Sequence, residues 1–313
     1  MGSTAPAVLL AQIAGEPPAV REPIRPRLLA SFAVGHIRYY ELSESTRVER
    51  RFPDGTVRRW ERQGRYLLRF YPFTERDNDM VEVACRVEEL RYRIRQDTAQ
   101  FEFDSRFPER LSARIPDREF MSLLLGTEVE ILLSPYGDIA DIRGEQLQWL
   151  RDFIHQQVGR DTVLLASNLA AISNARWAAL FDLHKGILPG IRIREDSTWK
   201  RLITLWIEGV EWRDTATIHI ARTTDTSRVV VGVLPALQSS SSRAWLPDMP
   251  RTPLQIADAR GHAQIAVELA PRGLLLHCEL HAHTEYDAIP LGDGAPFRQT
   301  VQVTLSWRFL REE

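Results

Sequence analysis

The residue types best suited to chemistry lie on one short stretch, His277-Cys-Glu-Leu-His-Ala-His283. Successive side chains of a β-strand point to opposite faces, so His277, Glu279, His281 and His283 would share one face. Imidazole and carboxylate groups at this spacing suit a zinc ion. The same alternation is also typical of an antiparallel strand with one solvated face. The stretch therefore predicts a strand, with zinc binding as one of two interpretations.

No other stretch carries a motif for catalysis or cofactor binding. The chain lacks a phosphate-binding glycine loop, H-E-x-x-H and Cys-x-x-Cys. Asp104-Ser105 and Asp196-Ser197 each place an acid beside a hydroxyl, but neither lies in a G-x-S-x-G turn, so we expect them to serve turns or caps. We therefore predict a protein that is not an enzyme and needs no cofactor. A metal-dependent enzyme built on the histidine stretch is the alternative.

Large apolar side chains gather in the one long helical segment, from Gly144 to about Lys185. Apolar residues recur there at helical spacing, and Asp161 and Ser173 are good N-caps for two later pieces of helix. This segment is more apolar than the covering of one sheet face requires, so we expect an apolar groove beside it. Core packing is the alternative use of its tryptophans. The groove candidates are Leu150, Ile154, Trp177, Phe181, Trp199 and Trp206.

The segments on both sides of the helical stretch have the alternating pattern of β-strands. We predict an N-terminal antiparallel half at 27–142, a helical centre and connector at 143–198, and a C-terminal antiparallel half at 199–313. The fold class is mainly β with a central helical segment (α+β). Two curved antiparallel sheets or half-barrels would flank the helices at about 144–185.

Composition excludes several classes of partner. The formal net charge is −2 over 313 residues, so nothing in the overall charge attracts nucleic acid or an anionic membrane. Only Lys185 and Lys200 are lysines among the 40 basic residues, and the arginines are spread along the chain. Cys85 and Cys278 fall on the apolar phase of strand patterns, which predicts buried thiols. A single disulfide between them is the alternative.

The first 26 residues are rich in proline and alanine and predict an extended arm. No window approaches the roughly 20 apolar residues that a membrane-spanning helix needs, so the protein is expected to be peripheral to a membrane at most. The short apolar run 7–14 lacks a basic flank and is short for a signal peptide.

Two central segments resemble those of an uncharacterised family of exported bacterial β-rich proteins. They are Leu125-Gly-Thr-Glu-Val-Glu-Ile-Leu-Leu-Ser-Pro-Tyr-Gly-Asp138 and Leu188-Pro-Gly-Ile-Arg-Ile-Arg-Glu-Asp-Ser-Thr-Trp199, with Phe103-Asp-Ser105 as a third feature. Glu195 stands where the family usually has glycine, and Thr198 is an extra residue. The resemblance covers about 28–215 and implies location in the periplasm or cell envelope, without a known activity. The layout is also similar to the curved half-barrels of bacterial lipoprotein carriers, as an analogy of fold.

Two functions of different class follow from these features. The first is an envelope-associated carrier or binding module for a hydrophobic or lipid-like ligand. The second is a structural or accessory subunit that docks on a larger protein complex through the proline-rich arm and the sheet edges.

Overall fold

The strands of this protein form one continuous antiparallel sheet. The computed structural model describes residues 28–110, 121, 123–158, 160–189, 197–249 and 251–313, so the arm predicted at 1–26 lies outside the described residues. Within that part, the sheet has 13 strands in the order β6-β5-β3-β2-β1-β13-β12-β11-β9-β8-β7, with β4 paired to β3 and β10 to β11. The strands are β1 (Arg38–Arg51), β2 (Val57–Arg76), β3 (Met80–Gln96), β4 (Ala99–Asp104), β5 (Glu128–Leu133), β6 (Ile139–Arg143), β7 (Thr198–Ile207), β8 (Val210–Thr223), β9 (Arg228–Ser239), β10 (Arg243–Ala244), β11 (Leu254–Leu269), β12 (Leu275–Pro290) and β13 (Phe297–Glu312).

Strands from the two predicted β halves meet where β1 pairs with β13. The pairing runs from Arg38 opposite Glu312 to Arg51 opposite Arg298. The mainly β class with a central helical segment is confirmed, and the two halves share one sheet rather than forming two. The physical reason is that pairing β1 with β13 satisfies the backbone groups of two long strands that would otherwise be edges.

The β2 strand is longer than its sequence indicates. The sequence pattern predicts separate strands around Trp60 and Tyr66, yet β2 runs unbroken through Gly64. The Tyr66 ring lies over Gly64, where an added Cβ would come within 2.6 Å of it. Glycine is therefore needed at this position, and it marks a close approach of a neighbouring ring rather than a break in the strand.

Three helices lie between β6 and β7: α2 (Glu145–Val158), α3 (Thr162–Ala171) and α4 (Asn174–Phe181). Asp161 caps α3 by accepting hydrogen bonds from the backbone N–H groups of Val163 and Leu164, and Ser173 caps α4. Both predicted caps are confirmed. Phe153 has the same helical spacing as the buried Leu150 and Ile154 of α2, but it is 42% exposed and stacks on Trp149. No helix among the described residues is long and apolar enough to cross a bilayer.

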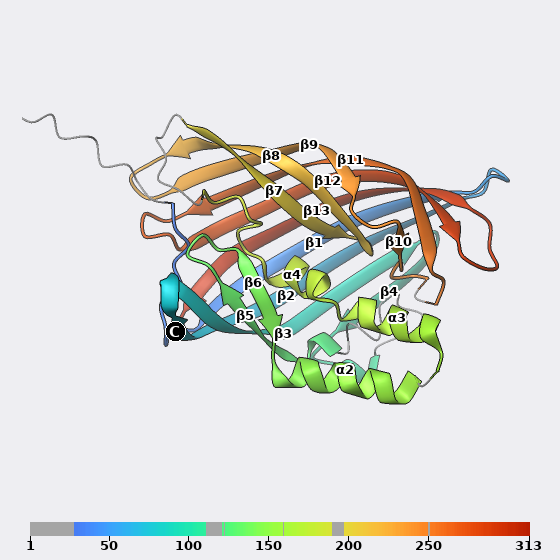
Figure 1. Ribbon diagram of the computed structural model, residues 1–313, viewed down its shortest axis with the longest axis horizontal. Coiled ribbons are helices and arrows are strands. Elements are labelled where there is room, and N and C mark those ends of the chain that lie inside the picture. Colours follow the sequence, from blue (N-terminus) through green and yellow to red (C-terminus); the bar gives the residue numbers. More distant parts are fainter. Residues whose placement is uncertain (1–27, 111–120, 122, 159, 190–196, 250) are drawn as a thin grey trace, which may run out of the picture.

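The sheet curves into a trough, and α4 lies against its inner face (Figure 1). Helix α4 contacts both β6 and β7, the two ends of the strand order. Its anchors are Trp177 and Phe181, which are almost fully buried and stacked on each other. After α4, Ile187 is attached to the start of β7, where the Trp199 indole donates a hydrogen bond to its carbonyl. The helical centre therefore fills the gap that the open sheet leaves.

Both cysteines are buried, as the strand alternation predicted. Cys85 lies on β3 and Cys278 on β12, and both are free thiols. Burial raises the pKa of Cys278 to about 12, with Lys185 opposing this effect and Asp182 adding to it. A thiol of this kind packs as a small apolar group and is a poor nucleophile at neutral pH.

Candidate functional site

The histidine stretch lies in the middle of β12, with its polar side chains on the face that points away from the helices. His281 approaches Glu279, with 3.0 Å between Nε2 and Oε1, and His277 lies 2.9 Å from the hydroxyl of Ser306 on β13. His283 faces His262 of β11 with its ring edge, at 5.3 Å between ring centroids. The shared face is confirmed, and it borders a hollow of about 700 Å³ that His262, His281 and His283 help to line.

A metal site on this stretch would need several ligand side chains arranged around one ion, in addition to a shared strand face. Among the residues that the structure describes, no group of three or more His, Cys, Asp or Glu side chains is arranged to hold a metal ion. Only Glu279 and His281 of the four candidates form a close pair. Zinc binding by this strand stays a prediction.

The six groove candidates separate into three kinds of environment. Leu150, Ile154, Trp177 and Phe181 are packed in the hydrophobic core. Trp199 is half-buried and holds the connector through the hydrogen bond to Ile187. Trp206, near the end of β7, is half-buried and borders open space, so it is the candidate around which a site can be described.

Three adjoining cavities share the Trp206 side chain, and we call them together the Trp206 cleft. Their volumes are about 250, 70 and 120 Å³. The largest lies between the helices and the loop before β11, where Trp245 and Arg243 line it. The other two lie between α4 and the inner face of the sheet. Small side chains of α4 leave this space, and the wall residues are Ala175, Ala178, Ala179, Leu42, Leu280, Val303 and Leu305.

A buried group of charged side chains, the inner cluster, forms the polar wall of the middle cavity. It consists of Glu44, Arg62, Tyr66 and Glu208. Arg62 Nε donates to Glu44 Oε1 at 2.6 Å, and its Nη2 donates to Glu208. The Tyr66 hydroxyl donates to the second oxygen of Glu44 at 2.8 Å. Arg62 on β2 therefore joins carboxylates from both halves of the chain, since Glu208 lies in the turn between β7 and β8.

The pKa values of the inner cluster follow from burial and pairing. Burial alone would raise the pKa of Glu44, but the Arg62 guanidinium and the hydrogen bonds from Tyr66 and Thr46 outweigh it, so this pKa is lowered. Burial, together with the nearby Glu44 charge, raises the pKa of Tyr66. Glu44 and Arg62 consequently form an ion pair at neutral pH, and Glu44 is not a poised general base.

One more charged group reaches the Trp206 cleft from α4. Arg176 is almost fully buried, and its guanidinium carbon lies 5.1 Å from the centroid of the Trp206 ring. Arg243 lines the largest cavity from an exposed position. The cleft thus combines apolar walls and two indole rings with three guanidinium groups, from Arg62, Arg176 and Arg243. Its lining also includes the carboxyl groups of Glu44, Asp182, Glu208 and Glu211. Apolar walls with a few polar groups are typical of a small-molecule site.

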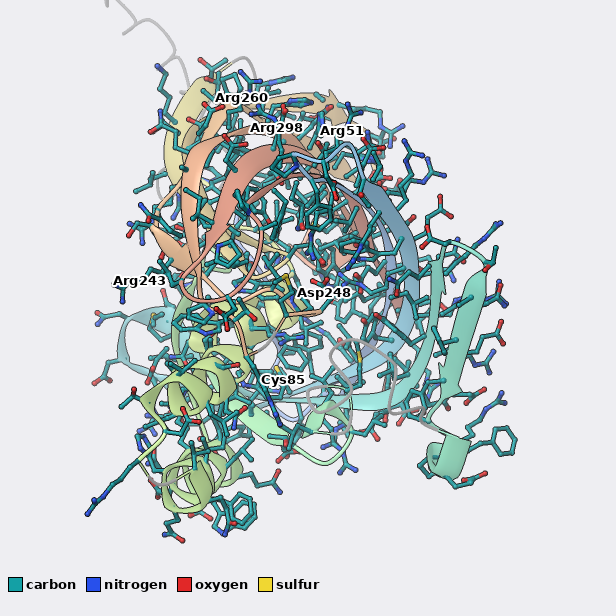
Figure 2. All side chains as sticks on the ribbon, turned by 90° about the vertical axis from the view of Figure 1, so that its right-hand side faces the viewer. Arg51, Cys85, Arg243, Asp248, Arg260 and Arg298 are labelled. Carbon is teal, nitrogen blue, oxygen red and sulfur yellow. The ribbon has the colours of Figure 1, made fainter. Side chains whose placement is uncertain are left out.

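A second buried ion pair closes the trough near one end. Arg50 of β1 donates to both carboxylate oxygens of Asp248, at 2.9 and 3.0 Å, and to the side-chain oxygen of Gln299. Its guanidinium also lies 4.2 Å from the centroid of the Phe297 ring. Figure 2 looks along the trough and places Asp248 inside its curve, with Arg51, Arg260 and Arg298 above it at the top of the curved sheet. This pair holds the loop before β11 over the sheet and so shapes one side of the cleft.

Sequence reasoning missed the inner cluster, although a signal for it exists. The inward-facing residues of β1 follow one alternating phase, and that phase contains Glu44 between Leu42 and Thr46. On β2 the inward phase likewise includes Arg62. A charge on the buried phase of a strand predicts a buried partner. The identity of that partner could not be predicted, because Glu208 is 146 residues from Arg62.

Comparison with known proteins finds a similarity of fold to one solved structure. No protein-family model matches the chain, and no curated protein sequence matches it. Among solved structures, one described as "Lipid-protein interactions in lipovitellin" is similar with a TM-score of 0.50 and 11% identity. The likeness covers 90% of this chain and 26% of that chain, so this protein spans about a quarter of the length of that relative. At this identity the similarity concerns the fold alone.

Two further matches have much lower scores. DynF from the dynemicin biosynthesis pathway of Micromonospora chersina has a TM-score of 0.20 at 7% identity and covers 93% of this chain and 92% of its own. OccK5 (OpdH) from Pseudomonas aeruginosa has a TM-score of 0.24 at 6% identity and covers 89% of this chain and 99% of its own. Scores this low support no conclusion about fold or function.

Proposed function

We propose that the protein is a non-enzymatic binding module of the bacterial periplasm or cell envelope, and that it takes a lipid-like ligand with a single chain in the Trp206 cleft. The observation that carries the proposal is the set of three adjoining cavities that share Trp206 and have apolar walls. The likeness of fold to lipovitellin, whose structure concerns lipid–protein interactions, agrees with this class of ligand.

The size of the cleft limits the ligand. The largest of the three cavities is about 250 Å³, below the roughly 300–1,000 Å³ of a typical small-molecule site. A two-chain lipid would need a larger space, whereas one aliphatic chain can run along the alanines of α4 from one cavity to the next. Arg176 and Arg243 give the largest of the three cavities two guanidinium groups, beside the carboxylate of Glu211. A guanidinium pairs well with a carboxylate, so we infer that a ligand with a carboxylate head group can bind at this end.

Binding of decanoate, measured by calorimetry and by native mass spectrometry, tests the proposal. Ala175 is half-buried and lines two of the cavities, so Ala175→Leu fills the space where the chain would lie. We expect Ala175→Leu to weaken binding at least about tenfold, which corresponds to about 1.4 kcal/mol. Ala166→Leu, the same change on α3 at a position that lines none of the three cavities, is the control and should bind as the wild type does. Absence of decanoate binding by the wild type would refute the proposal.

The second candidate is an accessory subunit, and a separate surface favours it. Trp149 and Phe153 stack on α2 at 5.4 Å between ring centroids, and they are 65% and 42% exposed. Adjacent exposed aromatic side chains are typical of protein interfaces. If this function is correct, protein purified from its own cells will carry another chain in fixed stoichiometry. The double variant Trp149→Ser/Phe153→Ser will lose that chain and keep its decanoate affinity.

A further inference from the structure

Lys185 is an exception in a chain that otherwise uses arginine. Lysine occurs at 185 and 200 only, against 38 arginines. Lys200 is exposed on β7, whereas Lys185 is 4% exposed and follows the end of α4. A lysine amine can lose its proton and act as a nucleophile, whereas an arginine guanidinium cannot.

The Lys185 amine is buried and has few groups around it that stabilise its protonated form. Nζ donates a hydrogen bond to the carbonyl of Ala179 at 3.1 Å and lies 4.1 Å from the centroid of the Trp307 ring. An ammonium has three donors, and among the described residues this is the one hydrogen bond that Nζ makes. Burial lowers the pKa of Lys185, while the nearby Asp182 carboxylate opposes the shift. The neutral amine is therefore favoured more than at an exposed lysine.

Lys185 also borders open space. It lines the cavity of about 120 Å³, together with Asp182 and the apolar side chains of Leu205, Leu280 and Leu305. This cavity adjoins the other two parts of the cleft through Trp206 and Ala179. Thr204 lines it from an exposed position on β7, so the cavity reaches the surface. A molecule in the cleft can thus place one end beside Nζ.

We propose that Lys185 forms an imine with an aldehyde group carried by an aliphatic ligand of the Trp206 cleft. The lone pair of Nζ attacks the carbonyl carbon, and a proton moves from nitrogen to oxygen to give a carbinolamine. The hydroxyl then leaves as water while the C=N bond forms, so one water is released and nothing is oxidised or reduced. The carboxyl group of Asp182 lines the same cavity, and its Oδ1 accepts hydrogen bonds from the backbone N–H groups of His184 and Lys185.

This inference rests on the proposed function, and it specifies that the ligand of the Trp206 cleft carries an aldehyde group. The test incubates the wild-type protein with decanal and cyanoborohydride at pH 7, which reduces an imine to a stable amine. Peptide mass spectrometry then compares the two lysines within the same molecule. We expect Lys185 to be modified at least about tenfold faster than Lys200, and decanoate to protect Lys185 alone.

Two variants separate the possible outcomes. Lys185→Arg should bind decanoate and lose the rapid adduct, while Lys200→Arg should keep it. If decanoate binds but Lys185 reacts no faster than Lys200, the imine is refuted and the ligand cleft stands. If decanoate does not bind and Lys185 does not react, both proposals fail. Because the comparison of Lys185 with Lys200 uses wild-type protein, it does not depend on whether Lys185→Arg folds.

Discussion

Arg62 is the residue on which the charge balance inside the trough depends. It lies between Glu44 and Glu208, and its side chain is 10% exposed. Two buried carboxylates near each other would be costly without it, because burial disfavours a charge that has no partner. Arg62 therefore stabilises the fold through the partners that it neutralises, rather than through packing alone.

The first prediction concerns the removal of this charge. Arg62→Met keeps a long apolar side chain but removes the guanidinium that pairs with buried Glu44, so we expect a loss of about 3–5 kcal/mol in the free energy of unfolding at pH 7. The measurement is urea denaturation followed by fluorescence. Arg59→Met on the same strand is the matched control, because Arg59 is 67% exposed and pairs with Glu49 at the surface. That change should cost at most about 1 kcal/mol.

The pH dependence of Arg62→Met tests the same argument with a definite sign. In the wild type the pKa of Glu44 is lowered, so its contribution to stability is present above the ordinary value of 4.5 and is lost as the pH falls. In the variant the Glu44 carboxylate no longer pairs with the Arg62 guanidinium, so burial raises its pKa and the folded protein is stabilised when Glu44 is protonated. The difference in stability between wild type and variant should therefore shrink from pH 7 to pH 4. A difference that stays constant would contradict the buried ion pair.

At the scale of elements, α3 depends on a cap at its first turn. The helix has 10 residues, too few for stability on its own, and the Asp161 carboxylate accepts from the N–H groups of Val163 and Leu164 at 3.1 and 3.0 Å. Asp161→Ala should cost about 1 kcal/mol of unfolding free energy. Ser167, Ala170 and Ala171 of α3 line the largest cavity of the Trp206 cleft, so decanoate affinity should fall as well.

The control for this change keeps the hydrogen bonds and removes the charge. Asp161→Asn should stay within a few tenths of a kcal/mol of the wild type, since asparagine caps about as well as aspartate. Thermal unfolding by circular dichroism measures both variants. Equal stability of Asp161→Ala and the wild type would show that tertiary packing alone positions α3.

Local features of these elements could be predicted from the sequence, and long-range ones could not. Asp161 and Ser173 were predicted as caps because a cap depends on residues two or three positions away. The Asp54-Gly55 pair is likewise a local turn signal, and Gly55 has the positive φ that such a turn requires. The β1–β13 pairing and the Arg62–Glu208 contact join residues far apart in sequence, so alternation shows which face is buried but names no partner. Of the six groove candidates, Trp206 lines the cleft, and Leu150, Ile154, Trp177 and Phe181 pack in the core.

At the scale of the whole molecule, an open sheet must protect the region between its end strands. Here the chain after α4 does so. Arg201 of β7 donates to Asp138, beside β6, at 2.7 Å and to the carbonyl of Leu188 at 2.6 Å. His184 lies in the same segment, 1% exposed, and packs closely against Gly137, where an added Cβ would come within 2.4 Å of its ring. These contacts connect the N-terminal half to the C-terminal half across the opening.

His184 makes this closure sensitive to acid. Neither ring nitrogen has a hydrogen-bond partner among the described residues, and burial, with the charges of Arg38 and Lys185, lowers the pKa of His184 to about 3. Between pH 6.5 and pH 3 the unfolded chain therefore binds a proton that the folded protein does not. The contribution of His184 to the free energy of unfolding is fully present above pH 6.5, where the imidazole is neutral in both states. It decreases as the pH falls, by up to about 1.4 kcal/mol per pH unit.

Replacing His184 by leucine should flatten that part of the pH profile. We expect the urea midpoint of His184→Leu to fall less than that of the wild type between pH 6.5 and pH 4. His155→Leu, at an exposed histidine of α2, should follow the wild-type slope. Hydrogen exchange adds the location: in the wild type, protection of β6 and β7 should decrease with acid before that of β11 and β12, because His184 lies in the segment that joins the two ends of the sheet. Parallel slopes for wild type and His184→Leu would contradict the assignment of this acid sensitivity to His184.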